Sequence, residues 1–261
     1  MAGILCVWAN LPEPALDWYE DMITGERNAN PDLYLDSLHC EVTASGMEGD
    51  PIGKLDSPWR WFTIHETSDL DKASSRSDAN QQTLTDTALI AEFKEARFDV
   101  RTYTEHKRWQ AEDWNGGETY NAEIASVAAM EWHLPADMED KVLDYYINDV
   151  APGIMTSPDV LRFRLFKVKN ATVWEKNTHT TLDKTALKTY FTLVELAGDE
   201  WPWAAIVDMA EDERWKAYFE SQTVVKWQLS HYLVQKSFPE RDSATGSDTG
   251  DDDSSDEYHT R

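Results

Sequence analysis

The sequence predicts an α+β protein made of two copies of one β-α-β-β-α-β unit that follow one another along the chain. Three observations support this fold class: short matches that recur in the same order in both halves, an alternation of β-rich and helical stretches, and a length that suits two small domains. The chain has 261 residues, of which 41% are hydrophobic and 28% are charged. Such a composition is typical of a globular protein with ample core material.

The repeat is clearest in the first helix of each half, where Leu16-Asp17-Trp18-Tyr19 aligns with Leu143-Asp144-Tyr145-Tyr146. Further segments match in the same order: 10–12 with 133–135, 31–33 with 158–160, and 62–66 with 191–195. A chance resemblance would rarely keep this order, so the matches indicate a duplicated unit.

Each half opens with a β-rich run, which is followed by a helix that starts among proline and acidic residues, as helix N-termini often do. An Asn-Pro or Ser-Pro turn follows this helix, since the residue before proline disfavours the helical conformation. Two strands rich in aromatic and β-branched residues, a second helix and a closing strand complete the unit. The predicted strands are 4–9, 37–43, 59–66 and 99–106 in the first half, and 127–132, 160–168, 189–196 and 224–234 in the second; the predicted helices are 15–23, 85–96, 138–150 and 203–220.

This order of elements is ferredoxin-like, and a ferredoxin-like sheet carries its helices on one face only. Its other face needs covering, so we expect the two sheets to pack together within the chain as one barrel. The expected boundaries are 1–107 for the first half, 108–124 for a linker, 125–238 for the second half and 239–261 for an acidic disordered tail. Residues 67–84 and 169–183 are polar and are predicted to be loops.

Several segments resemble a known family: Gly3-Ile4-Leu5-Cys6-Val7, then residues 18–23 with Arg27 and Asn30-Pro31, then Asp99-Val100-Arg101-Thr102-Tyr103. On these segments the chain is similar to the dimeric α+β barrel superfamily, and within it to the EthD-like proteins of fungi. The resemblance covers roughly residues 3–106 and 126–236. It implies a tandem ferredoxin-like barrel and, by analogy, enzymes of secondary metabolism that include decarboxylases, dehydratases, cyclases and cofactor-free monooxygenases of aromatic polyketides.

One departure from that family pattern concerns a histidine of the first helix. The position falls at Ile23 in the first half and at Val150 in the second. If this histidine acts as an acid or base in relatives, the chemistry here has either moved to other residues or been lost.

The charge of the chain narrows the classes of partner. The formal net charge is −25, and such a surface repels nucleic-acid phosphates and anionic membranes. The N-terminal apolar run has no basic residues before it and is too short for a signal peptide or a membrane span. We therefore expect a cytoplasmic protein, a monomer or weak homodimer, with a small-molecule ligand and neither nucleic acid nor membrane as partner.

The sequence contains none of the strong catalytic motifs, neither a nucleophile elbow nor a phosphate-binding loop nor a dinucleotide fingerprint. The spacing of its histidines and cysteines fits no zinc site. We predict no metal and no organic cofactor, which leaves acid–base chemistry by histidine, the side chain best suited to it near neutral pH.

His65 and His39 are the predicted catalytic residues. They fall on the third and second strands of the first half, which are neighbours in this topology, so the two rings can approach one another. His65 also corresponds to the apolar Val194 of the other half, so it is a polar residue in a segment whose pattern otherwise predicts a buried strand. The competing interpretation is a structural histidine bonded to backbone or solvent.

An aromatic-lined pocket with few polar groups suits a planar, apolar substrate, and the chain has 12 tryptophans. The predicted substrate-binding residues are Trp8, Trp61, Tyr103, Trp132 and His133. For each, ordinary sheet packing is the alternative. Arg162 and Arg164 share one face of a strand, and they can bind a substrate carboxylate, face solvent or pair with the acidic surface.

The first functional hypothesis is therefore a cofactor-independent enzyme, a lyase or cyclase acting on an aromatic or polyketide-like molecule. Decarboxylation, dehydration and cyclisation fit equally. The second is a non-catalytic, small-molecule-binding or stress-associated barrel, whose changed helix motif marks lost activity. A third is a protein–protein adaptor that uses the acidic tail.

Overall fold

A computed structural model describes residues 2–12, 15–43, 60–84, 96–112, 124–175 and 178–238, with side chains omitted for 79–84. The first half comprises β1 (Gly3–Asn10), α1 (Leu16–Ala29), β2 (Tyr34–Val42), β3 (Trp61–Thr67), α2 (Leu70–Leu84) and β4 (Arg97–Gln110). The second half comprises β5 (Ser126–His133), α4 (Glu139–Tyr145), α5 (Ala151–Ile154), β6 (Val160–Glu175), β7 (Thr178–Thr181), β8 (Tyr190–Leu196), α6 (Trp203–Glu211), α7 (Glu213–Trp215) and β9 (Lys226–Phe238). A π-helical turn joins α4 to α5 at Tyr146–Val150, and another follows α7 at Lys216–Glu220.

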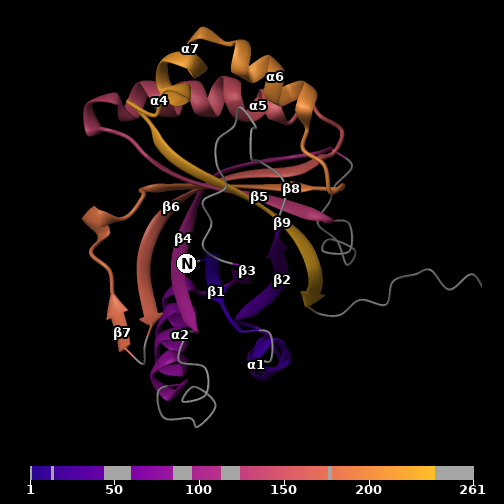
Figure 1. Ribbon diagram of the computed structural model, residues 1–261, viewed down its shortest axis with the longest axis vertical. Coiled ribbons are helices and arrows are strands. Elements are labelled where there is room, and N and C mark those ends of the chain that lie inside the picture. The colour runs from indigo at the N-terminus through magenta and orange to yellow at the C-terminus, as the bar shows by residue number, and fades with distance from the viewer. Residues whose placement is uncertain are drawn as a thin grey trace, which may run out of the picture.

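The strands form one closed antiparallel barrel (Figure 1). Its order is β4-β1-β3-β2-β9-β5-β8-β6, and β6 pairs back onto β4, while β7 adds to the far end of β6. Each half contributes four strands, and the seams between the halves are β2–β9 and β4–β6. The predicted fold class, two ferredoxin-like repeats packed as an intramolecular dimeric α+β barrel, is confirmed.

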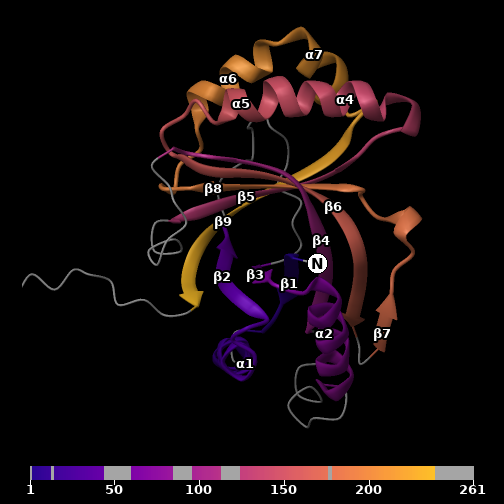
Figure 2. The same cartoon turned by 180° about the vertical axis from the view of Figure 1, so that it is seen from behind.

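The helices of each half cover the outer face of that half's own strands. In Figures 1 and 2 the helices α4–α7 lie across one end of the molecule and α1 and α2 lie at the opposite end, with the barrel between them. Because side chains alternate along a strand, every strand feeds two cores. On β1, Ile4 and Cys6 point into the barrel lumen, while Leu5 and Val7 pack on the side of α1.

Three hydrophobic cores result from this arrangement. The lumen holds stacked aromatic side chains from both halves, among them Trp8 on Phe62 and Tyr103 on Phe191, each pair with ring centroids 4.6 Å apart. The other two cores lie between the sheet and the helices of the first and second halves. The packed lumen has a cavity of only about 10 Å³, whereas each of the two sheet–helix layers has a pocket of about 70 to 80 Å³.

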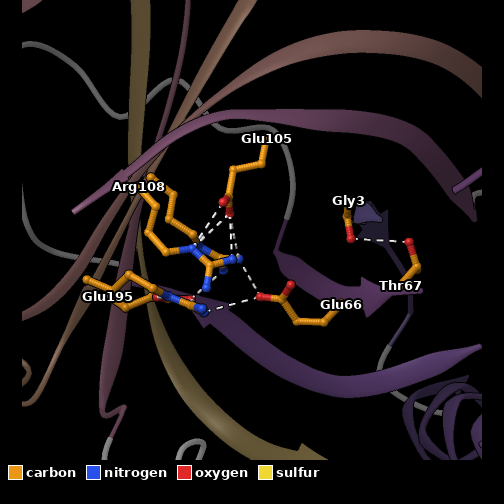
Figure 3. Close-up of polar contacts among 8 residues, drawn as sticks. Gly3, Glu66, Thr67, Glu105, Arg108 and Glu195 are labelled. Carbon is orange, nitrogen blue, oxygen red and sulfur yellow. Dashed lines mark hydrogen bonds and ion pairs between the residues drawn. The ribbon is translucent and has the colours of Figure 1, made fainter. Parts of the chain in front are cut away.

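The lumen also contains a buried ionic cluster that crosses between the halves (Figure 3). Arg162 and Arg164 of β6 contact Glu195 of β8 and Glu66 of β3, with Arg162 Nη2–Glu195 Oε1 at 2.7 Å and Arg164 Nη2–Glu195 Oε1 at 2.6 Å. Both arginine side chains are at most 2% exposed. The two arginines therefore do not face solvent, and they pair with acidic groups inside the barrel rather than with the acidic surface.

A second ionic cluster lies in the lumen around Arg101 of β4. Its guanidinium donates two hydrogen bonds of 2.9 Å to Asp99 and also contacts Glu131 of β5. The Tyr103 hydroxyl donates to the same Glu131 at 3.0 Å. Buried charges are stabilised by hydrogen bonds to groups of opposite charge, and each cluster has such a partner from the opposite half, although Arg164 Nε is buried without a hydrogen-bond partner among the described residues.

The predicted loop at 67–84 is wrong, because residues 70–84 form helix α2. The segment lacks glycine and proline, and two buried apolar side chains, Leu70 and Ala73, attach it to the sheet. Tertiary contact thus supports a helix whose polar composition resembles that of a loop. The helix predicted at 85–96 falls almost wholly outside the described residues.

Two other boundaries also differ from expectation. The predicted loop at 169–183 is largely β structure, because β6 continues to Glu175 and pairs with β7. Residues 108–110, assigned to the linker, continue β4, where Trp109 pairs with Phe163. Most of the remaining linker and the acidic tail from residue 239 lie outside the described residues.

Candidate functional site

The first-half pocket lies between the outer face of the first-half strands and the helix α1. Its volume is about 70 Å³. Apolar side chains form most of its wall, and it is lined by Leu5, Val7, Tyr19, Met22, Ile23, Glu26, Tyr34, His65, Ser77, Phe98 and Val100. A small set of polar groups in an otherwise apolar wall is the usual form of a small-molecule site.

Among the residues that line the first-half pocket, His65 is the histidine. Its Nδ1 is hydrogen-bonded to Ser37 Oγ at 2.7 Å, and its ring lies 5.3 Å from that of Tyr34. Burial, with smaller electrostatic contributions from His39 and Arg27, lowers the pKa of His65 to about 4. The ring is therefore neutral at pH 7 and starts any reaction as a hydrogen-bond partner or base.

His39 lies on the same face of the sheet as His65 but deeper. It is fully buried and is not among the residues that line the pocket. Its Nδ1 is hydrogen-bonded to Thr63 Oγ1 at 2.9 Å, and its ring stacks on Trp61 at 5.0 Å. Burial lowers the pKa of His39 to about 4. The structure therefore brings the two predicted catalytic histidines onto one face, and only His65 reaches the pocket.

A tyrosine–threonine pair supports the wall of each pocket. In the first half, the Tyr19 hydroxyl and Thr63 Oγ1 are 3.0 Å apart; in the second, the Tyr146 hydroxyl and Thr192 Oγ1 are 2.7 Å apart. Sequence reasoning did not select these residues. The signal was present, since both positions are identical in the two copies of the repeat.

The second-half pocket is the counterpart of the first-half pocket and lies between the second-half strands and α4–α7. Its volume is about 80 Å³, and among its lining residues Tyr146 and Thr192 are the ones with a polar side chain besides tryptophan. Three tryptophans, Trp201, Trp215 and Trp227, contribute to the wall. This pocket can hold an apolar molecule, but its wall contains no imidazole and no carboxylate.

The departure in the helix motif falls in these pockets. Ile23 lines the first-half pocket and Val150 lines the second-half pocket. Each apolar side chain thus occupies the position at which the resemblance expects a histidine. Apart from the tyrosines, the titratable side chains that line the first-half pocket are Glu26 of α1, which is paired with Arg76, and His65 of β3.

The predicted substrate-binding residues do not form one site. Trp8 and Tyr103 lie in the lumen, on the opposite face of the sheet from both pockets. Trp61 packs on His39, and Trp132 is fully buried with its Nε1 donating to Thr192 at 3.1 Å. His133 is exposed at the end of β5. Trp61 and Trp132 therefore support the residues behind the two pockets, and none of the five lines either pocket.

The described part of the chain contains no group of three or more His, Cys, Asp or Glu side chains arranged to hold a metal ion. The same residues include no helix with the length and apolarity needed to cross a bilayer. The side chains best placed to meet a bound organic molecule are those of the two pockets.

The chain has the dimeric α+β barrel fold, and comparison with solved structures agrees. It is similar to an anthrone oxidase-like protein, with a TM-score of 0.57, 12% identity, and coverage of 90% of this chain and 92% of the other. At this identity the likeness shows the fold alone.

Two further structures of similar coverage lie below a TM-score of 0.5. One is a candidate monooxygenase from Lactobacillus acidophilus (0.49, 8% identity, 90% and 95% coverage). The other is a ferredoxin-fold protein related to antibiotic biosynthesis monooxygenases from Listeria monocytogenes (0.41, 10% identity, 88% and 95% coverage). No protein-family model matches the sequence, and a search of curated proteins also finds no match.

Proposed function

We propose that the protein is a small-molecule enzyme that works in the first-half pocket, with His65 as the acid–base residue. The observation that carries this proposal is the position of His65: of the residues that line the two pockets, it is the one imidazole. Its apolar surroundings and the hydroxyls of Tyr19 and Tyr34 suit a planar, aromatic molecule that carries one or two polar groups. The EthD-like resemblance supports a decarboxylase, dehydratase or cyclase of aromatic or polyketide-like substrates.

The low pKa of His65 adds a condition on the substrate. A base whose conjugate acid has a pKa of about 4 is poorly matched to proton abstraction near pH 7. A negative group on the ligand beside the ring would favour the imidazolium form and raise that pKa. We therefore propose a substrate with a carboxylate or an acidic phenol, which brings the missing charge with it.

In this scheme His39 is a positioning residue. Its Nδ1 holds Thr63, and Thr63 in turn holds the hydroxyl of Tyr19 in the pocket wall. Replacing His39 should therefore change the placement of Tyr19 and raise KM, whereas replacing His65 should remove the proton transfer and lower kcat.

The test is turnover of aromatic carboxylic acids and phenolic polyketide analogues, with products detected by mass spectrometry. His65→Val copies the other half at this position and should abolish product formation while the protein stays folded. Val194→Ala, at the matching position of the second half, is the control and should retain activity. Unchanged product formation by His65→Val would overturn the proposal.

A second candidate function, a non-catalytic binding barrel, is favoured by the second-half pocket, whose wall has aromatic and aliphatic side chains and no acid or base. In that case a ligand would raise the melting temperature of the protein and be recovered unchanged. A melting scan combined with recovery of the ligand therefore distinguishes the two functions.

A further inference from the structure

We propose that the second-half pocket extends under Trp201 to His231, and that the extended site binds a planar aromatic molecule that carries one uncharged hydroxyl. This site is separate from the first-half pocket, so the inference does not depend on the proposed role of His65. It gives the second half a polar anchor behind a wall that is apolar except for the Tyr146–Thr192 pair and the tryptophan N–H groups.

His231 of β9 lies on the face of the sheet that forms the second-half pocket. It pairs directly with Ala128 of β5, and Ala128 lines this pocket. Leu229, two residues earlier on the same strand, also lines it. Directly opposed residues, and residues two apart along one strand, have their side chains on the same face of a sheet. The imidazole of His231 therefore lies on the helix side, beside the pocket.

The two halves place a histidine in the same row of their sheets. In the first half His65 of β3 is opposite Leu5 of β1, and in the second half His231 of β9 is opposite Ala128 of β5. Leu5 and Ala128 correspond in the repeat, since each lies five residues before a matching position, Asn10 or His133. Each of them lines the pocket of its half and has one histidine beside it.

The His231 ring has an unused hydrogen-bonding atom. The residue is 3% exposed, and its Nε2 is buried without a hydrogen-bond partner among the described residues. A buried polar atom without a partner costs free energy, which a ligand recovers when it supplies the missing hydrogen bond. Burial lowers the pKa of His231 to about 4 against an opposing effect of Asp199, so the ring is neutral at pH 7. A neutral ring can either donate or accept at Nε2, depending on its tautomer.

The indole of Trp201 lies against both His231 and the pocket. Its ring centroid is 5.0 Å from that of His231, and Trp201 lines the pocket, whereas His231 does not. Trp201 lies between β8 and α6 and is only half-buried, and the two residues before it are exposed. Rotation of this side chain toward solvent would uncover the imidazole and leave a space that suits another aromatic ring.

The chemistry of the extended site selects the ligand. Tryptophan and aliphatic side chains form most of the wall, which favours a planar apolar body. The Tyr146 hydroxyl and Thr192 Oγ1 are hydrogen-bonded to one another at 2.7 Å, so His231 Nε2 is the polar atom left for a ligand hydroxyl. Asp199 acts on this ring, and no cationic side chain is among the described residues that line the pocket, so a carboxylate is disfavoured. A neutral phenol fits these conditions, in contrast to the anionic substrate proposed for the first half.

The test is a titration of the full-length protein, labelled with ¹⁵N-histidine, with phenol. The ring nitrogens of His231 report on the second half and those of His65 on the first. Phenol should shift the His231 signals, and benzoate should shift them less at the same concentration. An unchanged His231 signal in the presence of phenol would overturn the inference. This measurement needs only the wild-type protein, so it stands whether or not the variants below fold.

Calorimetry in the Ile23→Phe background, which fills the first-half pocket, then measures the contribution of the imidazole. Adding His231→Phe keeps an aromatic ring against Trp201 but removes the ring nitrogens. It should weaken phenol binding about tenfold, the size expected for loss of one hydrogen bond, and leave the binding of toluene unchanged. Equal losses for phenol and toluene, or no loss for either, would show that no hydrogen bond forms at His231.

Trp201→Ala tests the displacement of the indole. It should tighten phenol binding, because the ligand no longer has to move this side chain. Trp203→Ala is the matched control, since Trp203 is 41% exposed, lies 6.4 Å from Trp201 between ring centroids and does not line the pocket. Phenol binding that is the same in both variants would overturn the role of Trp201. The proposed function fails separately, because turnover that survives His65→Val says nothing about the His231 signal.

Discussion

The two halves of the barrel share one frame and differ in the chemistry of their pockets. Both have a tyrosine–threonine pair behind the pocket and an apolar residue, Ile23 or Val150, on the first helix. The first half adds His65 to the wall, whereas the second has Val194 at the matching position of its strand. The two copies of the frame therefore differ at a few matching positions, and one of these differences gives the first-half pocket an imidazole that the second-half pocket lacks.

The halves differ most in how deeply the paired glutamates of the lumen are buried, which gives the largest expected effect. Glu195→Gln should lower the free energy of unfolding by about 3–5 kcal/mol, because it leaves the buried guanidiniums of Arg162 and Arg164 without their shared carboxylate. Glu66→Gln should cost less, since its side chain is partly exposed. Urea denaturation measures both.

Glu213→Gln breaks an exposed pair with Lys216 and is the matched control for these variants, with almost no expected change. Equal losses for Glu195→Gln and Glu66→Gln would show that burial does not distinguish the two glutamates.

Acid should destabilise the first half more than the second. Burial lowers the pKa of His39, His65 and His231 from 6.5 to about 4, so between these values the unfolded chain binds more protons than the folded one. The stabilisation from each neutral imidazole is complete above pH 6.5 and falls as the pH drops toward 4. It amounts to on the order of 3 kcal/mol for each ring.

Unfolding at a series of pH values between 7 and 4 measures this effect. His65→Asn should remove the contribution of one imidazole from the change in the free energy of unfolding between pH 7 and 4. Combining it with His39→Asn should remove the contribution of two. His133→Asn is the control, because that ring is exposed. A pH dependence that is the same in wild type and double variant would refute the assignment of low pKa values to the first half.

The tyrosine–threonine pairs provide a matched test of the shared frame. Thr63→Val removes the partner of Tyr19 and His39, and Thr192→Val removes the partner of Tyr146 and Trp132. Each should cost about 1–3 kcal/mol, because two buried polar groups lose a hydrogen bond in either case. Thermal or urea unfolding measures the loss.

Similar losses for Thr63→Val and Thr192→Val would indicate that the frame works alike in both halves. Should one of them be neutral, that pair is not part of the shared frame. Thr223→Val, on the exposed turn before β9, is the control.

The smallest expected effect concerns ligand binding in the second half. Benzene at ten times its Kd should stabilise the protein by about 1.4 kcal/mol, because an apolar pocket retains an apolar guest. Val150→Phe should abolish this stabilisation by filling the second-half pocket, and Ile23→Phe should leave it intact. The shift in melting temperature with and without benzene measures it, and the reverse pattern would place the guest in the first half.

The repeat, the order of elements and the correspondence of His65 to Val194 in the two copies could all be predicted from the sequence. They depend on local patterns and on matches between the copies. The helix at 70–84 could not, since its polar composition resembles a loop and its stability comes from Leu70 and Ala73 packed on the sheet. The five predicted substrate-binding residues do not lie together in one pocket, for a related reason. Sequence reasoning identified the aromatic residues but could not tell which face of each strand points into the filled lumen.

The sequence by itself determined the duplicated ferredoxin-like frame and the presence of His65 in one half where the other half has Val194. Both follow from periodicity and from the comparison of the two copies, which need no knowledge of the tertiary structure. Only the tertiary structure decided that Trp8 and Tyr103 are packing residues of the lumen, that His65 borders a pocket and His39 does not, and that Arg162 and Arg164 are buried among carboxylates. The physical reason is barrel closure. It sends alternate side chains of each strand into two environments, and it brings Glu66 and Glu195, 129 positions apart in the sequence, onto the same pair of arginines.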